Sequence, residues 1–184
     1  MTQKRTSKAE WLEKALEVLE VEGVNGVKID RLATLLKTSR SGFYWHFKDR
    51  RALFLNMLEY WKHEYTEVVI DGGGHDADLL PQERLLYVMK MIEQYDLDRF
   101  EVPIRAWADH DPEAAEVVKS VYAMRFKFIK SIFAEMGFAG ADLDMRVRLW
   151  LCYAINGKAM FGKPSRTKQS ERLKLCHQVL TCTG

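Results

Sequence analysis

The sequence contains few of the residues that break regular structure or cross-link a small fold. Its 4 Pro and 11 Gly in 184 residues are too few for an all-β chain with a turn about every ten residues. The three cysteines are odd in number and lack the spacing of a zinc site, so we expect reduced thiols, no metal and no cofactor. No apolar run approaches the roughly 20 residues of a membrane span. The first residues show no secretory apolar core, so we expect a cytoplasmic protein.

The charge of the chain is small but unevenly distributed. The formal net charge is +2. Residues 1–51 carry 11 Lys and Arg against 7 Asp and Glu, whereas residues 52–184 carry 17 against 19. Because blocks of charge usually form a solvated face, this asymmetry alone favours a nucleic-acid partner only weakly.

Apolar residues recur at helical spacing along nearly the whole chain, without an internal repeat. Ser7 and Glu10 form the pattern of a capping box before the first helix, and Asp49 is placed to open a long fourth helix. Leu32, Leu35 and Leu36 are expected to face inward. The pattern predicts an all-α protein of about nine helices, at 8–23, 29–36, 40–47, 49–71, 81–95, around 104–107, 112–136, 142–161 and 166–180.

The first three helices follow the helix-turn-helix plan, in which the second helix of a closely connected pair enters the DNA major groove. Arg40, Ser41 and Gly42 supply the small and cationic surface that such a helix needs at its start, and Arg40 suits a bidentate contact to guanine. Phe43 and Phe47 are expected to anchor the opposite face in the core. The residues expected at the DNA are Lys28, Arg31, Ser39, Arg40, Ser41, Gly42, Tyr44, Trp45, His46, Lys48 and Arg50.

At these residues the sequence resembles the tetracycline-repressor (TetR) family of bacterial regulators. The resemblance extends over about 45 residues in order and spacing, and its strongest part is the string from Phe43 to Leu53, which contains the family's Tyr-x-His-Phe pattern. The other matching positions are Ala15 to Leu19, Gly23, Gly26, Leu32, Ala33 and Ser39. The resemblance implies that residues 40–42 face the bases, that Tyr44 and His46 hold phosphates, and that Arg50 replaces a backbone-contacting lysine.

Two positions depart from the family pattern. Lys28 stands where the family usually has a threonine cap, and Lys37-Thr38 replace the usual Gly-Val of the turn. A residue other than glycine is mildly strained in a left-handed turn. These departures concern the angle of the helix pair, and therefore which bases are read.

The resemblance also implies a second domain that binds a small molecule and forms a homodimer. We predict a DNA-binding domain at residues 1–52 and a ligand-binding and dimerisation domain at 53–184. A small apolar or aromatic effector would release the protein, a repressor, from a palindromic operator in double-stranded DNA. The expected ligand contacts are Tyr95, Phe100, Trp107, Tyr122, Phe126 and Met160. The expected dimer contacts, on the last two long helices, are Val147, Trp150, Leu151, Ala154, Ile155, Leu173, Cys176 and Leu180.

Other interpretations are left open by the residues. Asp109-His110-Asp111 has metal-binding residue types, but such a string more often caps helices in an exposed loop. A helical protein that binds DNA without sequence preference, or a protein partner, is the main alternative to a regulator. An enzyme is less favoured, because the sequence has neither a nucleophile–base signature nor a phosphate-binding glycine loop.

Overall fold

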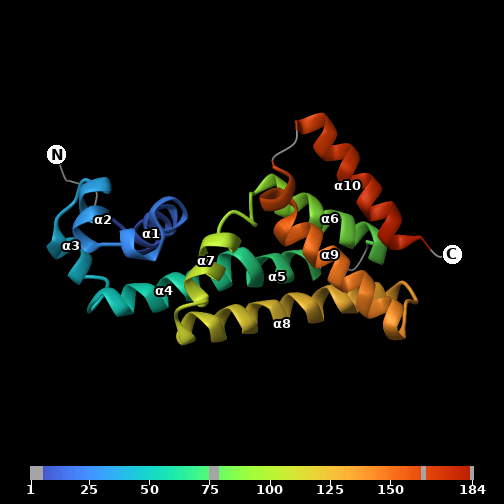
Figure 1. Ribbon diagram of the computed structural model, residues 1–184, viewed down its shortest axis with the longest axis horizontal. Helices are drawn as coiled ribbons and strands as arrows, with labels where there is room; N and C mark the ends of the chain where they lie inside the picture. The colour runs from blue at the N-terminus through green and yellow to red at the C-terminus, as the bar shows by residue number, and fades with distance from the viewer. Residues whose placement is uncertain (1–5, 75–78, 163–164, 183–184) are drawn as a thin grey trace. The chain divides into compact units, whose positions relative to one another are not determined.

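The computed structural model describes residues 6–74, 79–162 and 165–182. In this part of the chain all regular elements are helical (Figure 1), so the predicted all-α fold is confirmed. None of the described helices is both long and apolar enough to cross a membrane. The described residues form two compact units. The N-terminal unit comprises those of Met1–His63 and Val102–Val118, and the C-terminal unit those of Glu64–Glu101 and Lys119–Gly184.

Four helices make up most of the N-terminal unit. They are α1 (Lys8–Glu22), α2 (Ile29–Leu35), α3 (Arg40–Tyr44) and α4 (Arg50–Lys62), with a short 3-10 turn at Val24–Gly26. The predicted capping box is present, since the Glu10 amide donates to the Ser7 hydroxyl at 3.2 Å and the Ser7 amide donates to Glu10 at 2.6 Å. The Asp49 carboxylate likewise accepts from the Ala52 amide at 2.8 Å and opens α4.

Aromatic side chains form the centre of this unit. Trp11, Phe43 and Phe47 are buried, and the rings of Trp11 and Phe43 meet edge to face with centroids 5.5 Å apart. The predicted anchoring of α3 by Phe43 and Phe47 is therefore confirmed, and replacing either by alanine would cost about 3–5 kcal/mol. The inward placement of Leu35 is wrong, since Leu35 is exposed and the buried face of α2 consists of Leu32 and Ala33. Leu36, just after the helix, is half-buried.

The N-terminal unit extends past the predicted domain boundary at residue 52. Leu53 and Met57 of α4 are buried, and the Tyr60 hydroxyl donates to the Glu13 carboxylate of α1 at 2.8 Å. Helix α4 thus completes the core of the unit, and a unit ending at residue 52 would leave these apolar side chains exposed.

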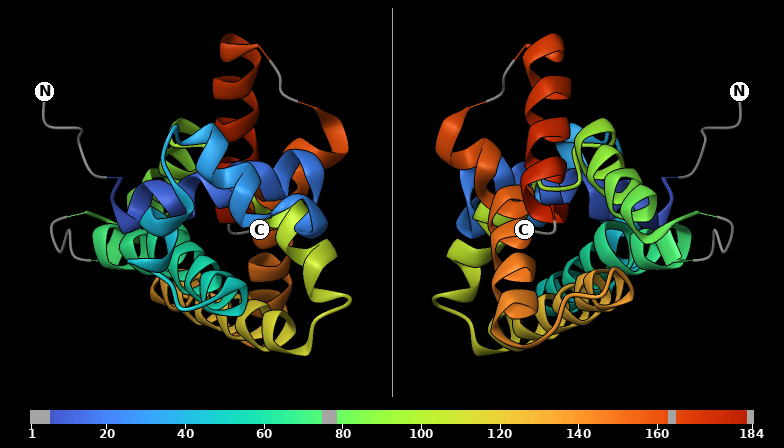
Figure 2. Two further views of the ribbon diagram at one scale, coloured as in Figure 1. Left: turned by 90° about the vertical axis from the view of Figure 1, so that its left-hand side faces the viewer. Right: turned by 90° about the vertical axis from the view of Figure 1, so that its right-hand side faces the viewer.

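The C-terminal unit contains the longer helices. Its elements are α5 (Val68–Gly74), α6 (Pro81–Gln94), most of α8 (Pro112–Glu135), α9 (Gly140–Phe161) and α10 (Arg166–Thr181). The predicted helix at 49–71 is divided by a π-helical segment, His63–Glu67, so the described residues form ten α-helices, of which α7 is Glu101–Ala108. Helix α10 packs against α6 (Figure 2), and the His177 ring donates to the Gln82 carbonyl at 2.8 Å.

Candidate nucleic-acid interface

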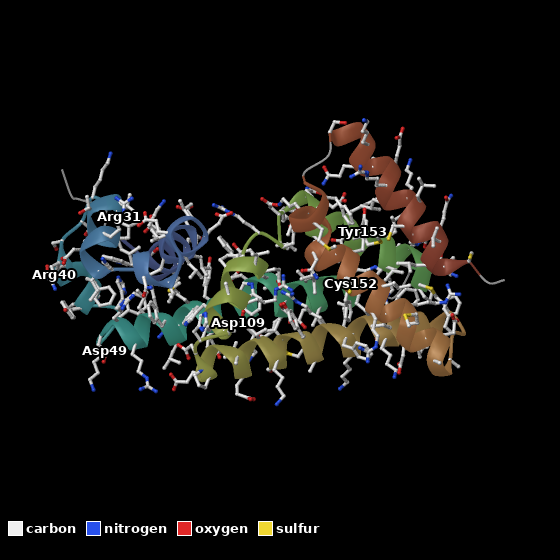
Figure 3. The ribbon with its side chains drawn as sticks, viewed as in Figure 1. Arg31, Arg40, Asp49, Asp109, Cys152 and Tyr153 are labelled. Atoms are coloured by element: carbon white, nitrogen blue, oxygen red, sulfur yellow. The ribbon has the colours of Figure 1, made fainter. Side chains whose placement is uncertain are left out.

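Helix α3 presents the short polar surface that the sequence predicts. Arg40, Ser41, Tyr44 and Trp45 are exposed, while Phe43 has no exposed surface. Figure 3 shows Arg40 at the surface of the N-terminal unit. The segment therefore has one face fixed in the aromatic core and a cationic and aromatic face directed toward solvent.

The turn between α2 and α3 is the site of one of the two family departures. Lys37 adopts a left-handed conformation with φ of 52°, which costs a residue with a Cβ atom about 1–2 kcal/mol. Ser39 occupies the N-cap position of α3, but its hydroxyl lies 2.7 Å from the Ser41 hydroxyl and makes no capping bond. The Ser39 side chain therefore does not cap α3, although Ser39 occupies the N-cap position of the backbone.

Two of the predicted DNA contacts are already paired with carboxylates. The Nε atom of Arg40 lies 3.1 Å from the Asp30 carboxylate of α2, and Arg31 is bonded to Glu22 at 2.9 Å. Both pairs are largely solvent-exposed, so each contributes no more than about 1 kcal/mol. Either guanidinium can exchange its carboxylate for a base or a phosphate at small cost.

Three further candidates differ in how much of the side chain is accessible. Trp45 is 68% exposed and Tyr44 is 53% exposed. His46 is half-buried, and its Nε2 atom donates to the backbone carbonyl of Thr6 at 2.9 Å. This bond fixes the backbone at Thr6, just before α1, to the His46 ring. It leaves the other ring nitrogen of His46 for a second partner.

The Arg50 side chain makes contacts that its position in the sequence did not predict. Its Nε atom donates to the Val27 carbonyl at 2.8 Å and its Nη2 atom to the Val24 carbonyl at 2.9 Å. The guanidinium also lies 4.6 Å from the ring centroid of Phe54. The cation supports the turn between α1 and α2. The remaining candidates, Lys28 and Lys48, are exposed, and Gly42 is half-buried.

The predicted ligand contacts line neither of two cavities in the C-terminal unit. Tyr95 and Met160 are 60% and 70% exposed, whereas Phe100 and Trp107 are buried. Trp107 belongs to the N-terminal unit. Tyr122 and Phe126 are half-buried. Aromatic rings suit a ligand pocket, which is why the sequence favoured these residues. In the structure, however, Phe100 and Trp107 are buried in the protein core.

The first cavity is mainly apolar and has a volume of about 40 Å³. We call it the apolar cavity. Its lining includes Val69, Ile70, Val88, Ile92, Leu97, Phe128, Ile129, Leu151, Ala154 and Ile155.

A buried polar network forms one part of the apolar cavity's wall. Arg125 donates to Glu101 at 2.6 Å, to the Thr66 hydroxyl at 3.0 Å and to the Tyr65 carbonyl at 3.3 Å. Glu101 and Thr66 are each only 1% exposed. Breaking such a buried pair by removing one partner costs about 3–5 kcal/mol. Sequence reasoning missed these residues, because the partners are 24 to 60 positions apart.

The predicted dimer contacts are largely inside the protomer. Four of them belong to the core of the C-terminal unit: Val147, Trp150, Leu173 and Leu180, each at most 5% exposed. Leu151, Ala154, Ile155 and Cys176 are half-buried, and the first three line the apolar cavity. The apolar stripes were identified correctly, but they pack within one chain and have little area left for a partner. The exposed apolar residues of the two helices include Met145, Leu149, Met160 and Phe161 on α9 and Leu175 and Val179 on α10. Cys152 of α9 is also exposed (Figure 3).

The Asp109-His110-Asp111 string caps helix α8, as its alternative interpretation predicts. The Asp111 carboxylate accepts from the amides of Glu113 and Ala114 at 3.0 and 3.3 Å, and from the Trp107 indole at 3.0 Å. These bonds hold the pKa of Asp111 below its ordinary value, against the opposing effect of burial. In the described part of the chain no three His, Cys, Asp or Glu side chains are grouped as a metal site would need.

The arrangement of α2, Lys37–Ser39 and α3 defines a helix-turn-helix protein of the DNA-binding class. Residues 12–57 match the family model described as bacterial regulatory proteins, tetR family. Residues 12–57 thus match the N-terminal helix-turn-helix segment of TetR-family regulators, which supports a DNA-binding regulator. A comparison with curated proteins finds no significant match.

Solved structures share the fold over nearly the whole chain. A TetR transcriptional regulator from Legionella pneumophila has a TM-score of 0.76 and 12% identity over 97% of this chain and 98% of its own. The regulator PfmR from Thermus thermophilus has a TM-score of 0.72 and 17% identity over 93% and 96%. A transcriptional regulator from Rhodococcus sp. has a TM-score of 0.73 and 14% identity over 96% and 94%. At these identities the likeness concerns the fold.

Proposed function

We propose that the protein is a homodimeric repressor that binds a palindromic operator through α3 and is released by a small apolar molecule. One observation carries the DNA-binding part of this proposal: α3 exposes Arg40 and Ser41 while Phe43 beneath them is fully buried. A recognition helix needs this combination, because a base contact requires an accessible side chain on a backbone that does not move. A protein acting on chromosomal DNA would work in the cytoplasm of a bacterium.

We assign the base contacts to Arg40, Ser41 and Gly42 at the start of α3. Lys28, Arg31, Ser39, Tyr44, Trp45, His46 and Lys48 are proposed to surround them and to hold sugar and phosphate groups. Arg50 belongs to this surface by position, but its two carbonyl bonds support the assignment of a structural role. A matched pair of variants, described below, separates the two roles.

The dimer is proposed to form through the exposed apolar residues of α9 and α10. Leu149 is 52% exposed, Met145 55%, Leu175 59% and Val179 68%. Side chains of this size gain about 25 cal/mol for each Å² of apolar surface removed from water. A two-fold dimer would also supply two recognition helices to successive major grooves, which lie about 34–36 Å apart.

The effector is proposed to occupy the apolar cavity. Its lining is mostly aliphatic, and the polar groups at its edge, Thr66, Glu101 and Arg125, bond to one another. Such a lining suits an apolar body and gives a polar ligand few open partners. A ligand that binds the DNA-free form better than the operator-bound form would shift the equilibrium toward release.

The experiment is an electrophoretic mobility shift with DNA from upstream of the protein's own gene, at about 50 and 200 mM salt. A repressor is expected to prefer a palindromic segment over random DNA at both salt concentrations. Arg40→Ala is expected to cost about 1–3 kcal/mol on the palindrome and to relax specificity at one base position. Equal losses on specific and random DNA would instead make Arg40 a phosphate contact. Binding that is steep in salt but has no sequence preference would indicate an architectural protein, and no binding would leave an enzyme or a protein-binding role.

A further inference from the structure

A second cavity adjoins the apolar cavity in the C-terminal unit. It has a volume of about 90 Å³ and lies among the end of α6, the chain before α7, the end of α9 and the first turns of α10. Ile92, Asp98 and Ala154 line both cavities. Since a cavity needs a volume of roughly 10–15 Å³ to hold one water, the second cavity has room for a small group of several heavy atoms. We call it the acidic cavity.

The charges that line the acidic cavity are not balanced. Three carboxylates, Glu93, Asp96 and Asp98, face two cations, Lys158 and Arg172. Lys158 is used by two of the carboxylates: its ammonium pairs with Asp96 and lies 3.4 Å from Asp98. The lining therefore carries a net charge of −1.

Glu93 is the carboxylate of this lining that Lys158 does not pair with. Within the described residues it forms no ion pair. Burial raises the pKa of Glu93 above its ordinary value, the neighbouring Gln169 side chain opposes this, and Asp98 adds to it. A cation placed beside Glu93 would relieve both unfavourable effects on the ionised form.

Aromatic rings complete the acidic cavity. Tyr153 of α9 lines it, half-buried, and Phe161 lines it with 73% of its side chain exposed. Ring faces attract organic cations, by about 0.5–1 kcal/mol at exposed sites and more when the contact is desolvated. Two rings beside Glu93 favour an alkylammonium. A metal ion is less favoured, because it needs several oxygen ligands together and the described carboxylates are not grouped as a metal site would need.

We propose that the two adjoining cavities bind one amphipathic organic cation, with its ammonium group beside Glu93 in the acidic cavity and its apolar body in the apolar cavity. This assignment rests on the proposed function, because it names the chemical class of the effector. It adds a cationic group to the small apolar effector of the proposed function, and so departs from the sequence-based expectation of a purely apolar or aromatic ligand. The shared residues Ile92, Asp98 and Ala154 mark where the two parts of the ligand would join.

The test is isothermal titration calorimetry of the full chain with three probes that share one ring. Benzyltrimethylammonium is the cation, benzyl alcohol the neutral analogue and phenylacetate the anion. The cation is expected to bind at least about tenfold more tightly than either analogue. Glu93→Gln is expected to remove that preference while leaving the weak binding of benzyl alcohol unchanged, which also shows that the variant is folded.

Glu171→Gln is the matched control, because Glu171 is an exposed carboxylate of α10 that does not line the cavity. It removes the same charge and is expected to leave the affinity for benzyltrimethylammonium within about twofold of the unsubstituted chain. Equal losses in the two variants, no binding of the cation at millimolar concentration, or equal affinity for the anion would each overturn the proposal.

A mobility shift with benzyltrimethylammonium distinguishes this proposal from the proposed function. Binding of the cation without release of DNA would retain the ligand class and reject ligand-controlled repression. Operator binding by a protein that shows no preference for the cation would retain the DNA-binding function and reject the ligand class.

Discussion

The Nε atom of Arg50 donates to the backbone carbonyl of Val27 across 23 positions of sequence, at 2.8 Å. This bond and the one to Val24 give a charged donor to the first carbonyl of the 3-10 turn between α1 and α2 and to the carbonyl of the residue that follows the turn. The residue stands at the start of α4, where a cation is expected to reach the DNA backbone. Its geometry instead makes it part of the support under the helix pair.

Arg50→Ala is therefore expected to lower the free energy of unfolding by about 1–2 kcal/mol, because the two carbonyls lose a charged donor and Phe54 loses its cation. Arg50→Lys is expected to recover little of this loss, since one ammonium cannot reproduce the planar fork. Urea unfolding followed by tryptophan fluorescence measures the effect. Lys48→Ala is the control, with stability unchanged within about 0.5 kcal/mol and the salt slope of DNA binding lowered by about one. If Arg50→Ala instead lowers that slope and leaves stability unchanged, Arg50 is a phosphate contact.

Lys37→Gly is expected to stabilise the N-terminal unit by about 0.5–1 kcal/mol. The left-handed conformation at φ 52° costs a residue with a Cβ atom about 1–2 kcal/mol, which glycine avoids. Part of this gain in stability is lost, because glycine loses more conformational entropy on folding. Lys37→Ala removes the same charge but keeps the Cβ atom, and no gain is expected from it. Thermal unfolding of the two variants side by side decides whether backbone strain or charge governs the turn.

Leu149→Glu is expected to dissociate the proposed dimer without unfolding the protomer, because Leu149 is exposed on α9 and a carboxylate would be buried in the proposed interface. Trp150→Ala, one position along, is expected to destabilise the protomer by about 3–5 kcal/mol, because its side chain is only 2% exposed within a single chain. Sedimentation at micromolar concentration and circular dichroism separate the two effects. A dimer that survives Leu149→Glu would place the interface on another surface.

The three thiols are expected to react at very different rates. Burial, with a smaller contribution from Glu93, raises the pKa of Cys176 to about 11, so only about one thiol in a thousand is ionised at pH 8. Iodoacetamide labelling followed by mass spectrometry should modify the exposed Cys182 first and Cys176 last, and the rate at Cys176 should rise as the pH approaches 11. Equal rates in the folded protein would contradict the burial of Cys176, whereas equal rates in urea are the expected control.

The helices could be predicted closely because their ends are encoded locally. Ser7 and Asp49 cap α1 and α4 as the sequence indicates. The recognition segment is indicated by its residue types and by the family resemblance from Phe43 to Leu53. The π-helical segment at His63–Glu67 had no sequence signal, since its extra residue is accommodated by contacts such as Arg125 with the Tyr65 carbonyl.

The pocket and the interface were harder to predict for a different reason. Periodicity identifies which face of α9 is apolar, as at Val147 and Trp150, but it does not say whether that face meets its own chain or a partner. Aromatic residues such as Phe100 and Trp107 suit a ligand equally well as a core. Only the folded chain shows that these side chains are buried and that the cavities are lined mostly by aliphatic and charged residues.

The ion pairs of Arg40 with Asp30 and of Arg31 with Glu22 have a consequence for how the protein would search for its target. DNA would have to compete with carboxylates that already hold these cations, so each contact is an exchange of partners rather than a new attraction. Random sequences offer only phosphates in return, whereas a matched guanine offers Arg40 two aligned acceptors. Internal competition of this kind would weaken stray binding more than target binding, by no more than about 1 kcal/mol for each pair. It would add that much to the discrimination of a target among the many sites of a genome.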